Sequence, residues 1–252
     1  MKIDFPAADH MPQLRALWQD AFGDSDDFLD SFYRTAYAPD HCRCVLADDL
    51  VAAVLYWIDC SLEDQKLAYI YAVVTHPDFR GRGLCRKLLV DTHALLKSRG
   101  YAGAVLVPQK EGLRSMYAGM GYQNMGGIAQ FQSLAGAAPI PLRAVGPEEF
   151  NALRRTMLPE GGILQENAGL AFLAEQLQFY AGQDFLLAAY EVQGKCFGVE
   201  LLGNPDAAPG ILKALDCTQG TFRIPGSEKP FAMVFPLTSD AKIPRYLGFA
   251  FD

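Results

Sequence analysis

Several features that would place a chain in a specialised class are missing from this sequence of 252 residues. No apolar run approaches the roughly 18 residues that a membrane-spanning helix needs, so the sequence predicts no membrane partner. The opening residues, MKIDFPAADHMPQL, lack the apolar segment of a secretory signal and are interrupted by Pro6 and Pro12. We therefore expect a cytoplasmic protein.

Positive charge is scarce relative to negative charge. The chain has 22 Lys and Arg residues against 29 Asp and Glu residues, which gives a formal net charge of −7. Nucleic-acid-binding proteins usually present a basic face, and the basic clusters here are short, so we expect no nucleic-acid partner. An acidic protein attracts cations, which favours a cationic small molecule or peptide as the partner.

Cysteine is also sparse: six residues are scattered along the chain without the framework of a disulfide-rich secreted protein. This pattern predicts free thiols in a reducing compartment. The sequence HCRC, His41 to Cys44, leaves zinc binding as an alternative. A strand explains it better, because alternate residues of a strand point the same way and cysteine suits a half-buried face. No second CxxC or HxxxH pair accompanies it, so we expect no metal.

The apolar residues that are present follow helical and strand periodicities in the first part of the chain. Helices are expected at residues 11–22, from Ser25 onward, at 84–99 and at 112–122. Strands are expected at residues 66–76, 102–108 and 128–134, and over 42–62, where Asp48-Asp49 forms the turn of a hairpin.

The segment LAGAAPIPLRAVGPEEF, rich in small residues and proline, predicts a domain break near residues 134–141. We therefore expect one domain at residues 1–135 and a second at 136–252. The second part repeats the order of the first: helices at 147–158 and 170–182, a hairpin at 185–203 with its turn at Gln193-Gly194, a helix at 210–220 and a strand at 231–237. This order indicates a diverged tandem repeat.

Glycine and arginine alternate where the chain passes from a strand to the helix at 84–99. The stretch reads RGRGLCR from Arg80 to Arg86. Glycines let successive backbone N–H groups turn inward, and the first turn of a helix leaves such groups unpaired, so together they form an anion site suited to phosphate. The P-loop pattern is absent and the dinucleotide fingerprint lacks its third glycine. The alternative is a basic surface turn that caps a helix.

The stretch VVTHPDFRGRGLCRKLL resembles motif A of the GCN5-related N-acetyltransferases (GNAT), with the core pattern Gln/Arg-x-x-Gly-x-Gly/Ala. Arg80 and Gly83 match this pattern, and Cys85 stands where Gly or Ala is usual. The resemblance implies acetyl-CoA as co-substrate, with its pyrophosphate on the backbone of Gly81 to Arg86 and its pantetheine arm on the preceding strand end. The implied cofactor-binding residues are Val73, Val74, Thr75, Arg80, Gly81, Arg82, Gly83, Leu84, Cys85 and Arg86.

A second match lies in MYAGMGY, which is similar to the family's Tyr-x-x-x-Gly-Phe/Tyr helix and places Tyr117 on the general-acid tyrosine. The alternative is a core tyrosine at helical spacing. The resemblance implies an α/β fold with a mixed sheet. The layout also resembles the first two domains of the "enhanced intracellular survival" acetyltransferases, with residues 1–135 as the GNAT domain that binds acetyl-CoA and carries out the reaction. Residues 136–252 lack the Arg-Gly-x-Gly loop, which implies a degenerate GNAT-like second half.

These features predict an acyl-CoA-dependent N-acyltransferase that moves an acetyl group to a primary amine. A thiol has a pKa of about 8.5 and a tyrosine about 10, so Tyr117 can protonate the departing thiolate. The general base stays open among water and the side chains of Asp26, Asp27, Asp30 and Glu111. The acidic balance favours a cationic acceptor: a polyamine, an aminoglycoside, a lysine side chain or a peptide N-terminus. The alternative is an acetyl-CoA-binding sensor or regulatory protein without catalysis, although Tyr117 argues for chemistry.

Overall fold

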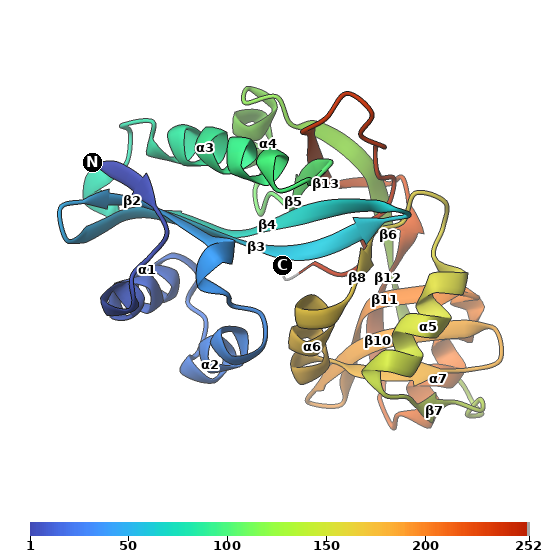
Figure 1. Cartoon of the computed structure of the whole chain (residues 1–252). Coiled ribbons are helices and arrows are strands. Elements are labelled where there is room, and N and C mark those ends of the chain that lie inside the picture. The colour runs from blue at the N-terminus through green and yellow to red at the C-terminus, as the bar shows by residue number, and fades with distance from the viewer. Residues whose placement is uncertain (251–252) are drawn as a thin grey trace. The chain divides into compact units, whose positions relative to one another are not determined.

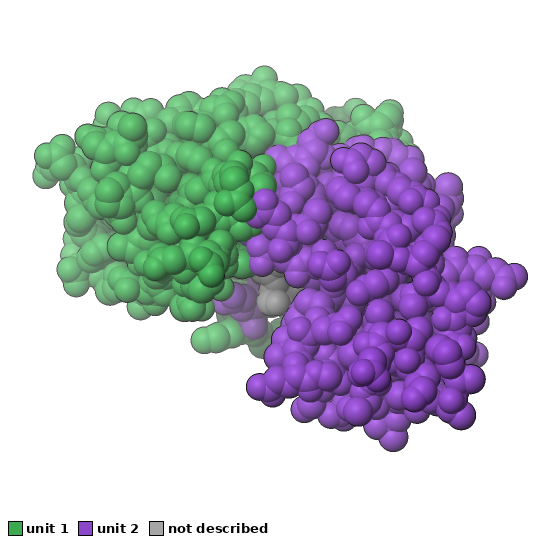
Figure 2. Space-filling model, turned by 90° about the horizontal axis from the view of Figure 1, so that it is seen from below, with its two compact units in different colours: residues 1–106, 110–123, 234–242 green, residues 107–109, 124–233, 243–252 purple. Residues whose placement is uncertain are grey.

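The protein is described here by a computed structural model that covers residues 1–250 and consists of two compact units. Residues 1–106, 110–123 and 234–242 form the first unit, while the second contains residues 107–109, 124–233 and the segment from Ile243. Figure 2 colours the two units separately. The predicted division at residue 135 differs from these units at three places, the first being residues 107–109, which belong to the second unit. Residues 124–135 join the second unit, because strand β6 (Gln123–Leu134) pairs there along its length, and residues 234–242 return to the first.

The first unit is built on a sheet with the strand order β1-β2-β3-β4-β5. Only β4 and β5 run parallel; the other neighbours are antiparallel. The hairpin predicted at Asp48-Asp49 is confirmed, with Asp48 in the left-handed region at φ 53°. The last segment of β13 follows β5 in the order, and the Leu237 N–H donates to the Ala102 carbonyl at 2.8 Å. The bounds are β1 (Lys2–Asp4), β2 (Cys42–Ala47), β3 (Leu50–Leu62), β4 (Gln65–Thr75), β5 (Gly103–Leu106) and β13 (Lys229–Pro236).

Helices cover both faces of this sheet. Figure 1 shows α1 (Met11–Phe22) and α2 (Asp26–Thr35) on one face and α3 (Leu84–Ser98) and α4 (Glu111–Ala118) on the other. All four predicted helices are present, although the last, expected to reach residue 122, ends at Ala118. Helix α2 begins where the sequence indicates, because the Ser25 side chain accepts a hydrogen bond from the Phe28 N–H and caps the helix. Short 3-10 turns lie at η1 (Ala8–His10), η2 (Pro39–His41) and η3 (Pro77–Phe79).

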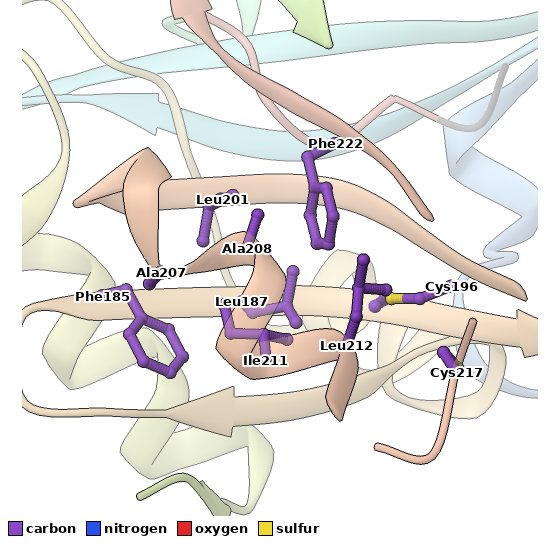
Figure 3. Close-up of a cluster of buried hydrophobic side chains, with 11 residues drawn as sticks. Phe185, Leu187, Cys196, Leu201, Ala207, Ala208, Ile211, Leu212, Cys217 and Phe222 are labelled. Atoms are coloured by element: carbon purple, nitrogen blue, oxygen red, sulfur yellow. The ribbon is translucent and has the colours of Figure 1, made fainter. Parts of the chain in front are cut away.

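The second unit has its own run of strands in the order β6-β12-β11-β10-β9-β7. Strands β11 and β12 are parallel, whereas β10 pairs antiparallel with β9 and β11. Helix α7 packs its Ile211 and Leu212 on Leu187 and Phe222 of the sheet (Figure 3). The remaining bounds are β7 (Arg143–Ala144), α5 (Pro147–Met157), β8 (Leu164–Gln165), α6 (Asn167–Gln176), β9 (Gln178–Ala181), β10 (Phe185–Val192), β11 (Lys195–Gly203), η4 (Pro205–Ala207), α7 (Ala208–Ala214) and β12 (Gln219–Gly226).

Both units mix helices with parallel and antiparallel strands, which confirms the predicted α/β class. Two expectations in the second part were wrong. The helix expected at 170–182 ends at Gln176, because the following residues form β9 against β10 and bury Phe179 and Ala181. The helix expected at 210–220 ends at Ala214, and β12 was missed. Within residues 1–250, no helix combines the length and apolar character needed to cross a membrane.

Candidate active site

Near its C-terminal end, strand β4 is no longer paired with its neighbour β5. The parallel pairing of the two strands covers Leu67 to Tyr69 opposite Gly103 to Val105, while β4 continues to Thr75. On its other edge β4 carries a bulge, since the register with β3 shifts between the pairs Tyr56–Tyr71 and Val54–Val74. Ala72 in this bulge has a φ of 47°, which is uncommon for a residue with a side chain. The predicted residues Val73, Val74 and Thr75 therefore lie on a strand segment whose β5-side edge is free of β5.

The glycine-arginine loop joins this strand end to helix α3. Gly81 and Gly83 have φ angles of 73° and 71°, which glycine adopts without strain. The first helical hydrogen bond runs from the Lys87 N–H to the Gly83 carbonyl, so the amides of Leu84 and Cys85 precede it. Within the described residues no side chain caps this N-terminus and its first turn has no acidic residue. These features fit a bound pyrophosphate, for which backbone donors and the positive end of the helix dipole are suited.

The three arginines of the loop donate to backbone carbonyl groups. Arg80 Nε donates to the Thr75 carbonyl at 3.2 Å and Arg82 Nη2 to the Asp78 carbonyl at 2.8 Å. Arg86 Nη2 donates to the Gly119 carbonyl at 2.6 Å. The first contact ties the loop to the end of β4, and the last ties it to the turn after α4. All three side chains are exposed, so a bound anion can replace these carbonyls as the acceptor of their hydrogen bonds.

Tyr117 lies on α4 with 7% of its surface exposed. Burial, and to a smaller degree the nearby Cys85 thiol, raises the pKa of the Tyr117 phenol well above its usual value, so it is protonated at neutral pH. Burial also raises the pKa of the Cys85 thiol, to about 11. The structure therefore brings Tyr117 and Cys85 together, although sequence places them in separate motifs. Tyr117 packs edge-on against Tyr122 with ring centroids 5.6 Å apart.

The carboxylates left open as the general base are mostly engaged in ion pairs. Arg15 contacts Asp26 at 3.3 Å and Asp30 at 2.8 Å. Glu111 contacts Arg114 at 3.6 Å, one turn along α4. Asp27 is exposed in the first turn of α2, where its charge favours the helix dipole. The assignment of the base stays open.

The cysteines of HCRC lie in strand β2, as the strand interpretation predicts. Cys42 and Cys44 are fully buried with their Sγ atoms 4.0 Å apart, and burial raises the pKa of Cys42 well above its usual value. Both faces of this strand are covered, so the half-buried face expected from sequence is wrong. Among residues 1–250, no cluster of three or more His, Cys, Asp or Glu side chains is arranged to hold a metal ion.

Two residues beside the candidate acid were missed by the motif analysis. His93 on α3 and Tyr122 after α4 are 8% and 3% exposed, and their Nε2 and hydroxyl atoms share a hydrogen bond of 2.8 Å. Burial lowers the pKa of His93 to about 4. The available signal was the spacing of His93, which shares the apolar stripe of α3 with Leu89 and Leu96.

Comparisons with known proteins identify relatives of this arrangement. The profile of the acetyltransferase (GNAT) domain matches residues 2–125. A GCN5-related N-acetyltransferase from Kribbella flavida has a similar structure, with a TM-score of 0.71 and 15% identity over 92% of this chain and 70% of its own. Eis1 from Mycobacterium abscessus gives a TM-score of 0.66 and 11% identity over 94% of this chain and 74% of its own. A search of curated proteins found no match to the sequence. At these identities the structural likeness shows the fold, and it extends beyond residue 125 into the second unit.

Proposed function

Residues 2–125 match the model of the acetyltransferase (GNAT) domain, and from that premise we propose that the chain transfers an acetyl group from acetyl-CoA to a primary amine, with Tyr117 as general acid. The proposal rests on the loop from Arg80 to Gly83. Two glycines with left-handed backbones precede the uncapped N-terminus of α3 there. The strand before the loop, β4, extends beyond its pairing with β5. Such a loop offers backbone donors for a pyrophosphate, and the free strand edge offers donors and acceptors for an amide-containing arm.

Tyr117 supplies the proton that the leaving group needs. The amine nitrogen forms a bond to the thioester carbonyl carbon, the carbon–sulfur bond breaks, and the phenol proton passes to the sulfur. The amine loses its own proton to a base or to water, and the phenolate is reprotonated from solvent. Burial raises the pKa of Tyr117 and so weakens it as an acid. The same low-polarity surroundings destabilise the departing thiolate, which raises its proton affinity and keeps the transfer feasible.

The acceptor that we propose is cationic. The chain carries a net charge of −7, and three Asp residues lie on the first turns of α2, of which Asp26 and Asp30 share a single arginine. An acidic surface raises the local concentration of polyamines and of other amines that are protonated at neutral pH. Spermidine, kanamycin and a lysine-containing peptide are therefore suitable probes for the polyamine, aminoglycoside and lysine classes.

The first test is calorimetric titration of the protein with acetyl-CoA. We expect binding that weakens at least tenfold in the R80A/R82A variant, because two charge-assisted donors are removed from the loop. The R99A variant is the matched control, since Arg99 lies at the opposite end of α3 and donates to the Asp40 carbonyl. It should bind acetyl-CoA as the wild type does. Absence of binding in the wild type would refute both acetyl transfer and the sensor alternative.

The second test measures release of the CoA thiol with each of the three probe amines. We expect turnover with at least one amine, and a loss of about 100-fold in kcat for the Y117F variant with acetyl-CoA binding unchanged. Binding of acetyl-CoA without turnover for any amine would favour the sensor. Turnover that Y117F leaves intact would remove Tyr117 as the acid while the transferase assignment stands.

A further inference from the structure

The turn that follows Tyr117 is packed against a strand from the far end of the sequence. Phe235 on β13 belongs to the first unit and lies 5.5 Å from the Tyr122 ring, centroid to centroid. Gly121 in this turn has a φ of 98°, and a Cβ there would come within 2.9 Å of the Phe235 ring. The absence of a side chain at residue 121 thus allows the phenylalanine to contact the backbone of the turn.

A hydrogen bond fastens the same turn to helix α3. His93 stacks on Phe235 with ring centroids 4.2 Å apart and an interplanar angle of 24°, and its Nε2 bonds the Tyr122 hydroxyl. The Tyr122 N–H in turn donates to the Tyr117 carbonyl at 3.1 Å, and the two tyrosine rings meet edge-on. Tyr122 therefore touches Tyr117 through both its backbone and its ring, and is itself held from two sides.

We propose that Tyr122 is a positioning residue for the Tyr117 phenol, and that Phe235, supplied by strand β13 where the chain returns to the first unit, completes the support together with His93. The inference rests on the proposed function for its catalytic consequence, because positioning matters to the rate only if Tyr117 delivers the proton. It goes beyond that function by making residues from the C-terminal end of the chain part of the N-terminal site.

The geometry favours positioning over simple filling of space. A phenylalanine at residue 122 would fill the same volume, so tyrosine is needed there only for its hydroxyl, which His93 satisfies. Each of the three supports comes from a different element: α3, the turn after α4, and β13. Loss of one contact leaves the other two elements in place, so we expect the fold to survive while the Tyr117 ring is held less tightly.

The test uses the full-length protein labelled with 3-fluorotyrosine and followed by fluorine NMR. The Tyr117 signal is assigned by its loss in the Y117F variant and is then titrated with pH in the wild type and in the Y122F and F235L variants. In the wild type the fluorophenol should titrate well above free 3-fluorotyrosine. In both variants we expect the signal to move toward that of the free amino acid and its apparent pKa to fall by about one unit, because the ring becomes accessible to water.

The matched control is F222L, which alters a fully buried phenylalanine in the core of the second unit (Figure 3), whereas the Tyr117 turn belongs to the first unit. This variant should lower stability at least as much as F235L does, because Phe222 is fully buried and Phe235 only partly, and it should leave the Tyr117 signal unchanged. An unchanged Tyr117 signal in Y122F and F235L would overturn the proposal. So would an equal change in F222L, since it would reflect general loosening.

Kinetics with the amine that supports turnover separate this proposal from the proposed function. Y122F and F235L should lower kcat about tenfold with KM for acetyl-CoA unchanged, and should cause no further loss when combined with Y117F. Losses that multiply in the Y117F background would mean that the two residues act independently of Tyr117 and would overturn the proposal. Full activity of Y117F alone would instead refute the acid, while the fluorine signal would still decide whether the ring is held.

Discussion

Replacement of Gly83 by alanine tests whether the left-handed loop is built for an anion. Gly83 has a φ of 71°, and a Cβ placed on it meets nothing within 4 Å. The cost of an alanine is therefore backbone strain alone, about 1–2 kcal/mol for a left-handed residue with a side chain. Residue 83 is exposed, and the hydrogen bond that its carbonyl accepts from the Lys87 N–H is the first of the helix, so we expect the loop to relax by giving up this bond and turning the amides of Leu84 and Cys85 away. Binding must then restore the strained conformation, which weakens the affinity for acetyl-CoA about 5- to 30-fold.

Gly100, at the other end of α3, is the matched control for this change. Its φ is 80° and its Cβ position is equally open, but hydrogen bonds from the Gly100 and Tyr101 N–H groups to the last carbonyls of the helix hold the turn, and Tyr101 is buried. G100A therefore cannot relax. It should lose about 1–2 kcal/mol in the free energy of unfolding and bind acetyl-CoA as the wild type does.

Calorimetric titration with acetyl-CoA and unfolding in urea measure the two quantities on both variants. The expected result is a crossed pattern, with affinity reduced in G83A and stability reduced in G100A. Wild-type affinity in G83A would refute the reasoning, because it would mean that the left-handed geometry of the loop is irrelevant to the ligand. An equal loss of affinity in G100A would refute it too, since the loss would then follow from strain anywhere in α3.

Two further predictions concern buried charge. Burial lowers the pKa of His93 to about 4. Between about pH 6.5 and pH 4 the unfolded chain therefore binds a proton at this residue that the folded chain does not bind, and the free energy of unfolding falls as the pH drops through this range. Between pH 7 and pH 5 the wild type should lose about 2 kcal/mol more than H93Q in urea titrations; parallel losses would contradict this. In the second unit Arg154 and Glu200 form a fully buried pair, with Nε and Nη2 at 2.6 and 2.9 Å from the carboxylate. E200Q should cost about 3–5 kcal/mol, while the R154M/E200L double variant should recover most of it; equal loss in both would argue against a cost of unpaired charge.

Local signals explain why the first unit was the better predicted. Ser25 caps α2, Asp48 turns the hairpin, and the apolar stripe of α3 begins directly after Gly83, so each element is specified by residues within its own segment. The loop could be recognised for the same reason, because its glycines and the helix that follows are consecutive. Ion pairs were harder to predict from the sequence, because a pair such as Arg15 with Asp26 joins residues of two different helices.

The second unit shows where the local signals mislead. The run from Leu170 to Gly182 reads as one apolar helix, yet Leu177 has an extended backbone and the residues after it pair with β10. Strand β12 was missed because its sequence, QGTFRIPG, contains two glycines and a proline, which weaken any strand pattern. Its partners, β6 and β11, supply the pairing. Tertiary contacts overrode local preference at both places. Glu200 carried a usable signal, because it is a charged residue within the apolar stretch that follows Lys195 in β11.

The returning strand is the feature that no local pattern could reveal. A composition shift near residue 135 marks a real change in the chain, but the first unit ends only with residues 234–242, after the chain has passed through residues 124–233 of the second unit. Pairing across such a separation in sequence is set by the closure of the fold, and it leaves no period or cap to read. It also bears on the two missed site residues, because the rings of His93 and Tyr122 both contact Phe235, which that return brings to them. The domain that a sequence profile delimits at residues 2–125 is therefore smaller than the structural unit that holds Tyr117.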